Sequence, residues 1–251
     1  MSDQLQQSRT AERAAAKTRA DIRACIFDLD GTLIDSEPVY RASDTAFLAS
    51  YGVDYDDDFY HSVMGRGTGE FIEVVKSRFP QSPLNSLGPS EALKLKDAAY
   101  LAYAKGRTKA FPSMKQTALD LAARGCPRAI ASGSSPHVIR AVLAEAGLEN
   151  IFPVIVSAAE MARGKPEPDI FLEAARRLGV EPGCCLVFED SRSGILAAAA
   201  AHMPCFLFPE KGMSDPSFSL ATKIFPGGAR LAAAEDIEDA IREFAPRLLG
   251  Q

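Results

Sequence analysis

The sequence predicts an α/β protein with a doubly wound, Rossmann-like parallel sheet and an inserted all-helical cap domain. From residue 109 onward, short apolar runs alternate with amphipathic helical segments, an alternation typical of βαβ units. An isolated apolar run at 22–27 precedes them, and residues 37–108 show helical spacing with no convincing strand. The simplest architecture is therefore a core of residues 21–36 and 109–251 with a cap of residues 37–108.

The composition excludes several classes of protein. The 251 residues, 47% hydrophobic and 24% charged, can form one large domain or two with a sizeable core. The chain lacks the run of about 18 apolar residues that a membrane span needs, and its net charge of −5 argues against a general nucleic-acid binder. Five cysteines without a CxxC pair favour a reducing compartment, which we take to be the cytoplasm. Residues 1–20 lack the apolar segment of a signal peptide, so we expect a flexible N-terminal extension.

The core elements can be placed in order along the chain. Serine and proline precede or open several helical segments, as Ser135 and Pro136 do, and glycine ends others, as Gly179 does. Residues 209–228 hold several Pro, Gly and Ser, and apolar spacing from Ile237 to Phe244 indicates a terminal helix. We expect strands at 22–27, 128–132, 154–156, 185–188 and 205–208, and helices at 113–124, 136–146, 168–178 and 193–202.

The cap is expected to contain helices throughout. One helix begins near Pro38 and continues to Gly52, and another covers residues 91–105. Residues 65–69, Gly-Arg-Gly-Thr-Gly, resemble a phosphate-binding turn, but no strand precedes them and the Lys-Ser/Thr of a P-loop is missing. This stretch favours a flexible loop before a helix capped by Thr68.

Two aspartates directly after the first strand are the most informative residues of the chain. Asp28 and Asp30 are separated by one residue, so their side chains point to the same side. Two such carboxylates need a cation, a shared proton or a substrate, although an acidic turn that caps the strand would also explain the pair. A calcium loop counted from Asp28 is excluded because its glycine and glutamate positions hold Leu33 and Val39.

Polar side chains follow the other predicted strands as well. Each of these polar segments alone is explained by a turn, a helix cap or a surface charge. However, the carboxyl ends of parallel strands meet at one edge of a sheet, so we expect the polar side chains to lie together. They would supply a hydroxyl, an ammonium group and up to four carboxylates. The segments are Asp28 with Asp30, Ser132-Gly-Ser-Ser135, Gly164-Lys-Pro166 and Glu189 with Asp190.

This set of groups is suited to phosphate chemistry. Several carboxylates in one crevice call for a hard cation, and Mg²⁺ bound through carboxylates and a phosphate fits. The helix start at 132–135 suits a phosphate group, and Lys165 adds the positive charge that the acidic chain otherwise lacks. A carboxylate can attack phosphorus, and a second acid two residues on can protonate the leaving oxygen and later deprotonate water.

These residues resemble the four motifs of the haloacid dehalogenase (HAD) superfamily, and the inserted cap is similar to its first cap class. The resemblance covers about residues 22–208, with all four motifs in the right order. That group includes phosphoglycolate phosphatase, sugar-phosphate phosphatases and beta-phosphoglucomutase. The matching segments are Asp28-Leu-Asp-Gly-Thr-Leu-Ile-Asp35, Ser132, Gly164-Lys-Pro-Glu-Pro-Asp169, and Phe188-Glu-Asp-Ser191 with Gly194.

The resemblance implies a role for each motif residue. Asp28 would be the nucleophile and Asp30 the general acid/base, and Asp30 argues against carbon–halogen cleavage because true dehalogenases lack it. Mg²⁺ would bind Asp28, the backbone carbonyl of Asp30 and Asp190, with Glu189 acting directly or through water. The transferring phosphoryl group would be held by Ser132, Gly133 and Lys165. The catalytic set would be Asp28, Asp30, Ser132 and Lys165.

The expected activity is a Mg²⁺-dependent phosphatase acting on a small phosphorylated metabolite, such as a sugar phosphate. A phosphosugar mutase is the alternative: beta-phosphoglucomutase carries a histidine where this chain has Tyr40, whereas Lys96 matches a cap lysine of that family. A non-catalytic phosphometabolite-binding protein should have lost Asp28 or Asp30, and both are present. We expect a monomer or weak homodimer. Four cap residues are candidates for contacting the leaving group: Tyr40, Arg66, Thr68 and Lys96.

Overall fold

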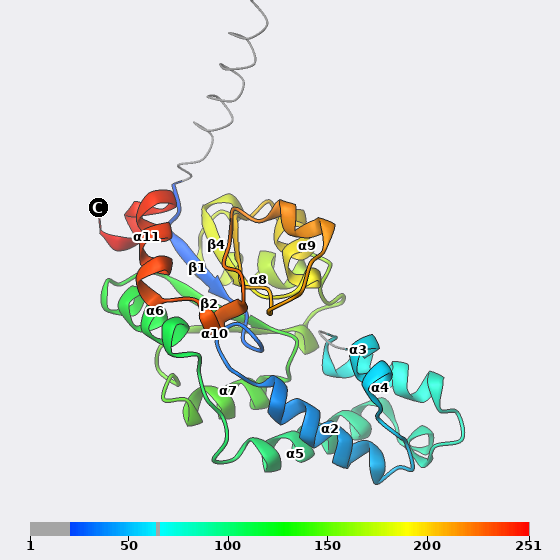
Figure 1. Ribbon diagram of the computed structural model, residues 1–251. Coiled ribbons are helices and arrows are strands. Elements are labelled where there is room, and N and C mark those ends of the chain that lie inside the picture. Colours follow the sequence, from blue (N-terminus) through cyan, green and yellow to red (C-terminus); the bar gives the residue numbers. More distant parts are fainter. Residues whose placement is uncertain (1–20, 64–65, 251) are drawn as a thin grey trace, which may run out of the picture.

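The computed structural model describes residues 21–63 and 66–250 (Figure 1). The expected N-terminal extension, residues 1–20, and Gly65 of the glycine-rich stretch lie outside this range. Six parallel strands form one sheet in the order β3-β2-β1-β4-β5-β6. Their bounds are β1 Ala24–Phe27, β2 Arg128–Ser132, β3 Val154–Ser157, β4 Cys185–Glu189, β5 Cys205–Leu207 and β6 Lys223–Ile224.

The two central strands carry almost continuous apolar side chains because both faces of the sheet are covered. All four residues of β1 are buried, and Phe27 lies between Ile130 of β2 and Phe188 of β4 in the register. The backbone N–H of Asp28 donates to the carbonyl of Phe188 at 2.9 Å, which aligns the ends of β1 and β4. This register places the acids that follow the two strands at the same edge.

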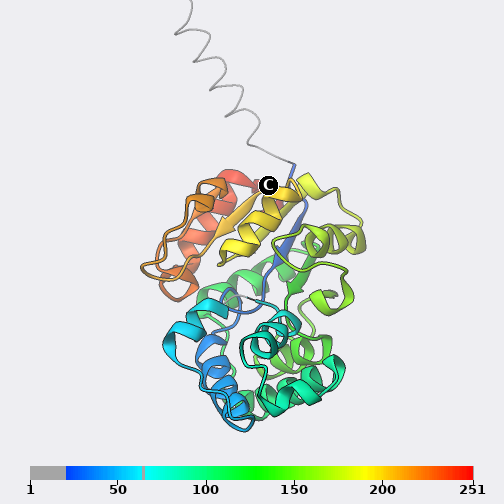
Figure 2. The ribbon, with the colours of Figure 1, turned by 90° about the vertical axis from the view of Figure 1, so that its right-hand side faces the viewer.

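Helices cover both faces of the sheet (Figure 2). On one face, apolar residues of α6, α7 and α11 join the core with Phe27 and Phe188. On the other, residues of α8 and α9 pack with Ile26 and Val187. The fold class predicted from the sequence is thus confirmed. The core helices are α6 Pro112–Ala123, α7 Pro136–Glu145, η2 Ala158–Glu160, α8 Asp169–Leu178, η3 Pro182–Cys184, α9 Arg192–Ala200, η4 Pro216–Leu220, α10 Gly228–Leu231, α11 Ala234–Phe244 and η5 Pro246–Leu249.

The remaining helices gather at one end of the sheet in both views (Figure 1 and Figure 2). They bury a separate apolar cluster that includes Phe47, Phe59 and Val75. The packing partners are mainly α2 with α5 and α4 with α5. Two chain crossings, near Asp35 and Lys109, connect this helical region to the sheet. The helices are α2 Glu37–Ala49, α3 Asp57–Val63, α4 Thr68–Arg78, η1 Pro83–Ser86 and α5 Pro89–Ala104.

Three local expectations need correction. Gly67, in extended conformation, precedes α4 as its N-cap, so Thr68 is the first helical residue and not the cap. Ser135 precedes α7 as expected, but its side chain makes no capping hydrogen bond. The Pro- and Gly-rich tail holds the short strand β6 beside β5, which the sequence did not indicate because two residues show no alternation. Along residues 21–63 and 66–250, no helix is both long enough and apolar enough to span a bilayer.

Candidate active site

The two aspartates after β1 bind different partners. Asp28 is buried, and its Oδ1 accepts a hydrogen bond from Nζ of Lys165 at 2.6 Å. Oδ2 of Asp30 instead accepts from the hydroxyls of Ser132 at 3.2 Å and Ser134 at 2.9 Å. The first carboxylate therefore lies against a positive charge, and the second lies among hydroxyl groups that can hold it in either protonation state.

Lys165 connects three strand ends through one ammonium group. Its Nζ donates to Asp28, to Oε1 of Glu189 at 2.6 Å and to the carbonyl of Ala131 at 3.2 Å. It also lies 4.9 Å from the centroid of the Phe171 ring on α8. All three ammonium protons are thus directed within the site, so the position of this side chain is fixed before any ligand binds.

Glu189 is fully buried and is held by the start of α9. Its Oε2 accepts from the backbone N–H groups of Asp190 at 2.8 Å and Ser191 at 2.9 Å, and from the Ser191 hydroxyl at 3.0 Å. A Cβ on Gly194 would lie 1.8 Å from this carboxylate. Glycine at that position is therefore required for α9 to begin around the buried acid.

The third carboxylate, Asp190, lies over the turn after β1. It accepts from the hydroxyl of Thr32 at 3.2 Å. Gly31 has φ +85°, and a Cβ there would stand 2.2 Å from Oδ2 of Asp190. Both the left-handed backbone and the lack of a side chain are needed for the acid to approach this closely.

Three of the predicted metal ligands lie together. Carboxylate oxygens of Asp28, Glu189 and Asp190 come within 4.8 Å of one another. Among the described residues, only the ammonium group of Lys165 pairs with these three acids. The donor set is entirely oxygen and carries excess negative charge, which suits Mg²⁺. The side chain of Asp30 is outside this cluster, so the proposed part of Asp30 in metal binding is limited to its backbone carbonyl.

The pKa values of the acids reflect the excess of buried carboxylates over positive groups in the cluster. Burial raises the pKa of Asp28 to about 8, although Lys165 lies beside it. Burial and the neighbouring Glu189 raise the pKa of Asp190 well above its usual range, and burial raises that of Asp30. For Glu189, burial acts to raise the pKa, but the ammonium of Lys165 and the hydrogen bonds from Ser191 together outweigh it, and the pKa is lowered. A bound divalent cation would stabilise the ionised form of these carboxylates in place of protons.

The segment after β2 contacts the cap. The Tyr40 hydroxyl on α2 hydrogen-bonds to that of Ser134 at 2.7 Å, and Ser134 in turn contacts Asp30. A Cβ on Gly133 would lie 3.4 Å from the Cα of Gly67. Thr68, the first residue of α4, is buried. The cap thus rests on the loop that is predicted to hold the phosphate.

Two of the predicted cap contacts are occupied by other partners. Nζ of Lys96 donates to Oδ1 of Asp44 at 2.8 Å, and both side chains are buried. The guanidinium of Arg66 pairs with Glu70 on the cap surface, so the structure does not bring it to the acids. The roles of Asp44 and Ser134 were missed by the sequence analysis. Asp44 lies four residues after Tyr40, a helical spacing that could have indicated its side of α2.

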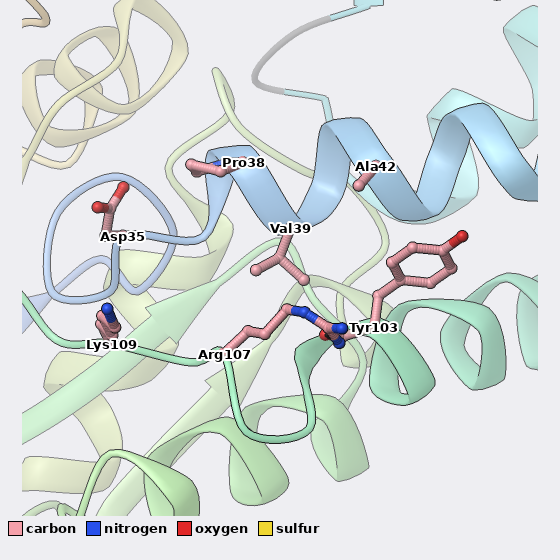
Figure 3. A pocket seen from close by; sticks show the side chains of 7 residues that line it. All are labelled: Asp35, Pro38, Val39, Ala42, Tyr103, Arg107 and Lys109. Atoms are coloured by element: carbon pink, nitrogen blue, oxygen red, sulfur yellow. Dashed lines mark hydrogen bonds between the residues drawn. The ribbon is translucent and has the colours of Figure 1, made fainter.

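At the hinge between the two regions, Oδ1 of the Asp35 side chain accepts from Arg230 at 2.7 Å. Its backbone N–H donates to the carbonyl of Lys109 at 2.8 Å, which joins the two chain crossings. A cavity of about 340 Å³ lies here, and none of its lining residues was predicted as a site residue. Figure 3 shows Val39 pointing from α2 toward Arg107 across this cavity, which is lined by Asp35, Pro38, Val39, Ala42, Tyr103, Arg107 and Lys109.

A buried aspartate, a second acid two residues on, a lysine and an acid cluster lie together at the edge of a parallel sheet, an arrangement suited to phosphoryl transfer. The family model of haloacid dehalogenase-like hydrolases matches residues 22–202. The chain belongs to this family. The resemblance stated from the motifs is therefore confirmed.

Among curated relatives, hexitol phosphatase B of Escherichia coli K12 is 31% identical over 206 residues, covering 81% of this chain and 91% of that protein. Fructose-1-phosphate phosphatase YqaB of the same organism is 33% identical over 178 residues, covering 71% and 92%. A crystal structure of CbbY from Rhodobacter sphaeroides with phosphate has a TM-score of 0.76 at 26% identity, covering 86% and 99%. The chain is thus a phosphatase-type enzyme of the family.

Proposed function

We propose that the chain is a Mg²⁺-dependent phosphatase of a small phosphorylated metabolite, a sugar or polyol phosphate, that works through an aspartyl-phosphate intermediate. The observation that carries the proposal is the separation of the two aspartates. Asp28 contacts Lys165 and the acid cluster, whereas the side chain of Asp30 accepts hydrogen bonds only from hydroxyl groups within residues 21–63 and 66–250. The names of the relatives, a hexitol phosphatase and a fructose-1-phosphate phosphatase, support the substrate class.

The metal would be held by carboxylates of Asp28, Glu189 and Asp190 and by the backbone carbonyl of Asp30. Mg²⁺ bound there supplies the positive charge that allows an anionic phosphate to approach several acids. Glu189 already accepts four hydrogen bonds from Lys165 and the start of α9, so we assign it mainly to positioning Lys165 and Asp190.

Different residues attack phosphorus, transfer protons and hold the phosphoryl group. Asp28 attacks phosphorus, and the bond between phosphorus and the leaving oxygen breaks. Asp30 gives its proton to that oxygen and then takes one from the water that hydrolyses the aspartyl phosphate. Ser132, the backbone at Gly133 and Lys165 hold the phosphoryl group. The raised pKa of Asp30 is consistent with an acid that begins the reaction protonated.

The test is phosphate release from a panel of sugar, polyol and carboxylic-acid phosphates with Mg²⁺ present. We expect Asp28→Asn to reduce kcat by roughly a thousandfold or more, and the matched surface control Asp236→Asn to leave it unchanged. No release from any substrate, or an Asp28→Asn variant as active as wild type, would contradict the proposal. Conversion of beta-glucose 1-phosphate to the 6-phosphate would indicate a mutase instead.

A further inference from the structure

The leaving group must meet the part of the site around Asp30, because that carboxyl is the proposed proton donor. Oδ2 of Asp30 is held by Ser132 and Ser134, and Ser134 contacts Tyr40 of α2. The Tyr40 ring in turn stacks on Tyr100 of α5 with centroids 4.1 Å apart. The wall beyond Asp30 is therefore formed by the loop after β2 and by one side of α2 and α5.

The positive charge in this wall is already neutralised. Nζ of Lys96 lies 5.3 Å from the centroid of the Tyr40 ring and 4.5 Å from that of Phe71, and it donates to Asp44 at 2.8 Å. The side chains of Lys96 and Asp44 are 4% and 9% exposed. An ion pair buried this deeply is kept by the attraction between its partners, so Lys96 is not free to bind a second anion.

Asp97, which follows Lys96 on α5, adds a carboxylate to this wall. The side chain of Asp97 is 4% exposed, and its buried Oδ2 has no hydrogen-bond partner in residues 21–63 and 66–250. Across the boundary with α7, Nε2 of His137 lies 3.5 Å from this oxygen, and this imidazole carries a charge only when it is protonated. The loop from Ser132 to Ser135 contains hydroxyl groups but no cationic residue. The ammonium of Lys96 is thus paired with Asp44, and the carboxylate of Asp97 faces the imidazole of His137.

We propose that the enzyme selects monophosphates whose leaving group is uncharged and rich in hydroxyl groups, and that Asp97 and the neutralised Lys96 select against a second phosphate or a carboxylate. This inference rests on the proposed function. A second anion would meet the carboxylate of Asp97 in a wall where the ammonium of Lys96 is already paired with Asp44, and such a mismatch is how a binding site rejects a charged analogue. Hydroxyl groups find partners in Tyr40 and the serines of the loop.

The direct test compares fructose 1-phosphate with fructose 1,6-bisphosphate, which differ by the second phosphate. We expect kcat/KM to be at least roughly tenfold higher for the monophosphate, the range that a single unfavourable charge contact produces. Equal or higher kcat/KM for the bisphosphate would overturn the inference.

Asp97→Asn tests the source of the selection. Removing this carboxylate should lower the ratio of kcat/KM for fructose 1-phosphate to kcat/KM for fructose 1,6-bisphosphate by about threefold or more. The control Asp120→Asn, an exposed aspartate on α6, should leave the ratio unchanged. Thermal unfolding and circular dichroism would establish that Asp97→Asn is folded. An unchanged ratio in folded Asp97→Asn would assign the selection elsewhere and overturn the role of Asp97.

A binding measurement separates this inference from the proposed function. Isothermal calorimetry with the Asp28→Asn variant and Mg²⁺ reports affinity for both fructose phosphates without hydrolysis. If wild type releases no phosphate from any ester, the proposed function fails, yet tighter binding of the monophosphate would still support the charge selection. Tighter binding of the bisphosphate would overturn the selection even if the phosphatase activity is present.

Discussion

At the scale of single residues, Lys165 and three carboxylates determine how the site is charged. One ammonium group donates to both Asp28 and Glu189. In the described part of the chain, the side chain of Asp190 accepts a hydrogen bond only from the hydroxyl of Thr32. Because burial removes water from these acids, the charge that Lys165 does not balance has to be met by protons or by a metal ion. The protein should therefore respond to pH differently with and without Mg²⁺.

We predict that the metal-free protein loses stability as pH rises from about 5 to about 8. The pKa of Asp28 is raised from 3.8 to about 8, so the folded protein binds a proton that the unfolded chain releases across this window. The raised pKa values of Asp190 and Asp30 act in the same direction. The lowered pKa of Glu189 and the raised pKa of Lys165 add no slope, because those groups titrate below and above the window.

Thermal unfolding at several pH values, with EDTA or with Mg²⁺, measures this effect. The increase in Tm on adding Mg²⁺ should be larger at pH 8 than at pH 5. At pH 8 the ionised carboxylates repel one another until the cation binds, whereas at pH 5 the cation must displace bound protons. Asp28→Asn should flatten the pH dependence of the metal-free protein, whereas Asp236→Asn should not. A Tm that rises with pH in EDTA would contradict the prediction.

At the scale of elements, the strand ends and the helices that begin beside them assemble the site. Much of this assembly could be predicted from the sequence. Asp28, Ser132 and Glu189 each end or follow a short apolar run, and the βαβ order alone brings such ends to one edge. Lys165 could be predicted only as a member of the set, since it follows β3 by eight residues and reaches Asp28 through its own length.

Other elements could not be predicted because their partners are distant in the sequence. Asp35 pairs with Arg230, 195 positions away, and no local pattern indicates that contact. The hydroxyl of Tyr40 contacts Ser134 only because α2 packs against the loop after β2. Lys96 was read as a substrate contact because its pairing with Asp44 depends on how α2 packs on α5. In each case tertiary packing decides what the side chain contacts.

The start of α9 provides a prediction at this scale. Gly194→Ala should destabilise the protein by about 3 kcal/mol, because the new Cβ would overlap the carboxylate of Glu189, which is itself fixed by three hydrogen bonds from residues 190 and 191. The displaced acid would also release Lys165, so phosphatase activity should fall more than the loss of folded protein accounts for. Denaturant unfolding and kcat measured at low temperature separate the two effects.

Gly69→Ala is the matched control for this change. Gly69 lies in the first turn of α4, and a Cβ there meets no atom within 4 Å. Since alanine is the better helix former, this variant should be as stable as wild type or slightly more so. If Gly194→Ala were tolerated as well as Gly69→Ala, the close fit between α9 and Glu189 would not be needed for folding.

At the scale of the whole molecule, the cap and the sheet meet directly over the site. The contacts between them include Tyr40 with Ser134, Gly67 with Gly133 and His137 with Asp97. Apolar side chains of α2 and α5 also join the buried cluster of the sheet. The two hinge crossings are joined by the backbone bond from Asp35 to Lys109, beside the cavity drawn in Figure 3. We predict that the cap closes over the site as one unit, which would exclude water from the acids.

We predict that Gly67→Val keeps the cap from closing. Gly67 has φ −63° and ψ 154°, which valine adopts without strain, so the backbone itself should be unaffected. A Cβ at Gly67 would lie 3.5 Å from the carbonyl oxygen of Gly133, and the two further methyl groups would push the cap loop away from the sheet. KM should rise by roughly tenfold, with faster hydrogen exchange in the loop after β2, because substrate positioning depends on closure.

Gly88→Val makes this test specific to the contact between cap and sheet. Gly88 is also the N-cap of a cap helix, with φ −65° and ψ 155°, and a Cβ there meets no atom within 4 Å. Both variants change the helix cap in the same way, so any general loss of helix stability is shared. Only Gly67→Val places new atoms against Gly133. A similar KM in the two variants would mean that the approach of these glycines does not control substrate binding.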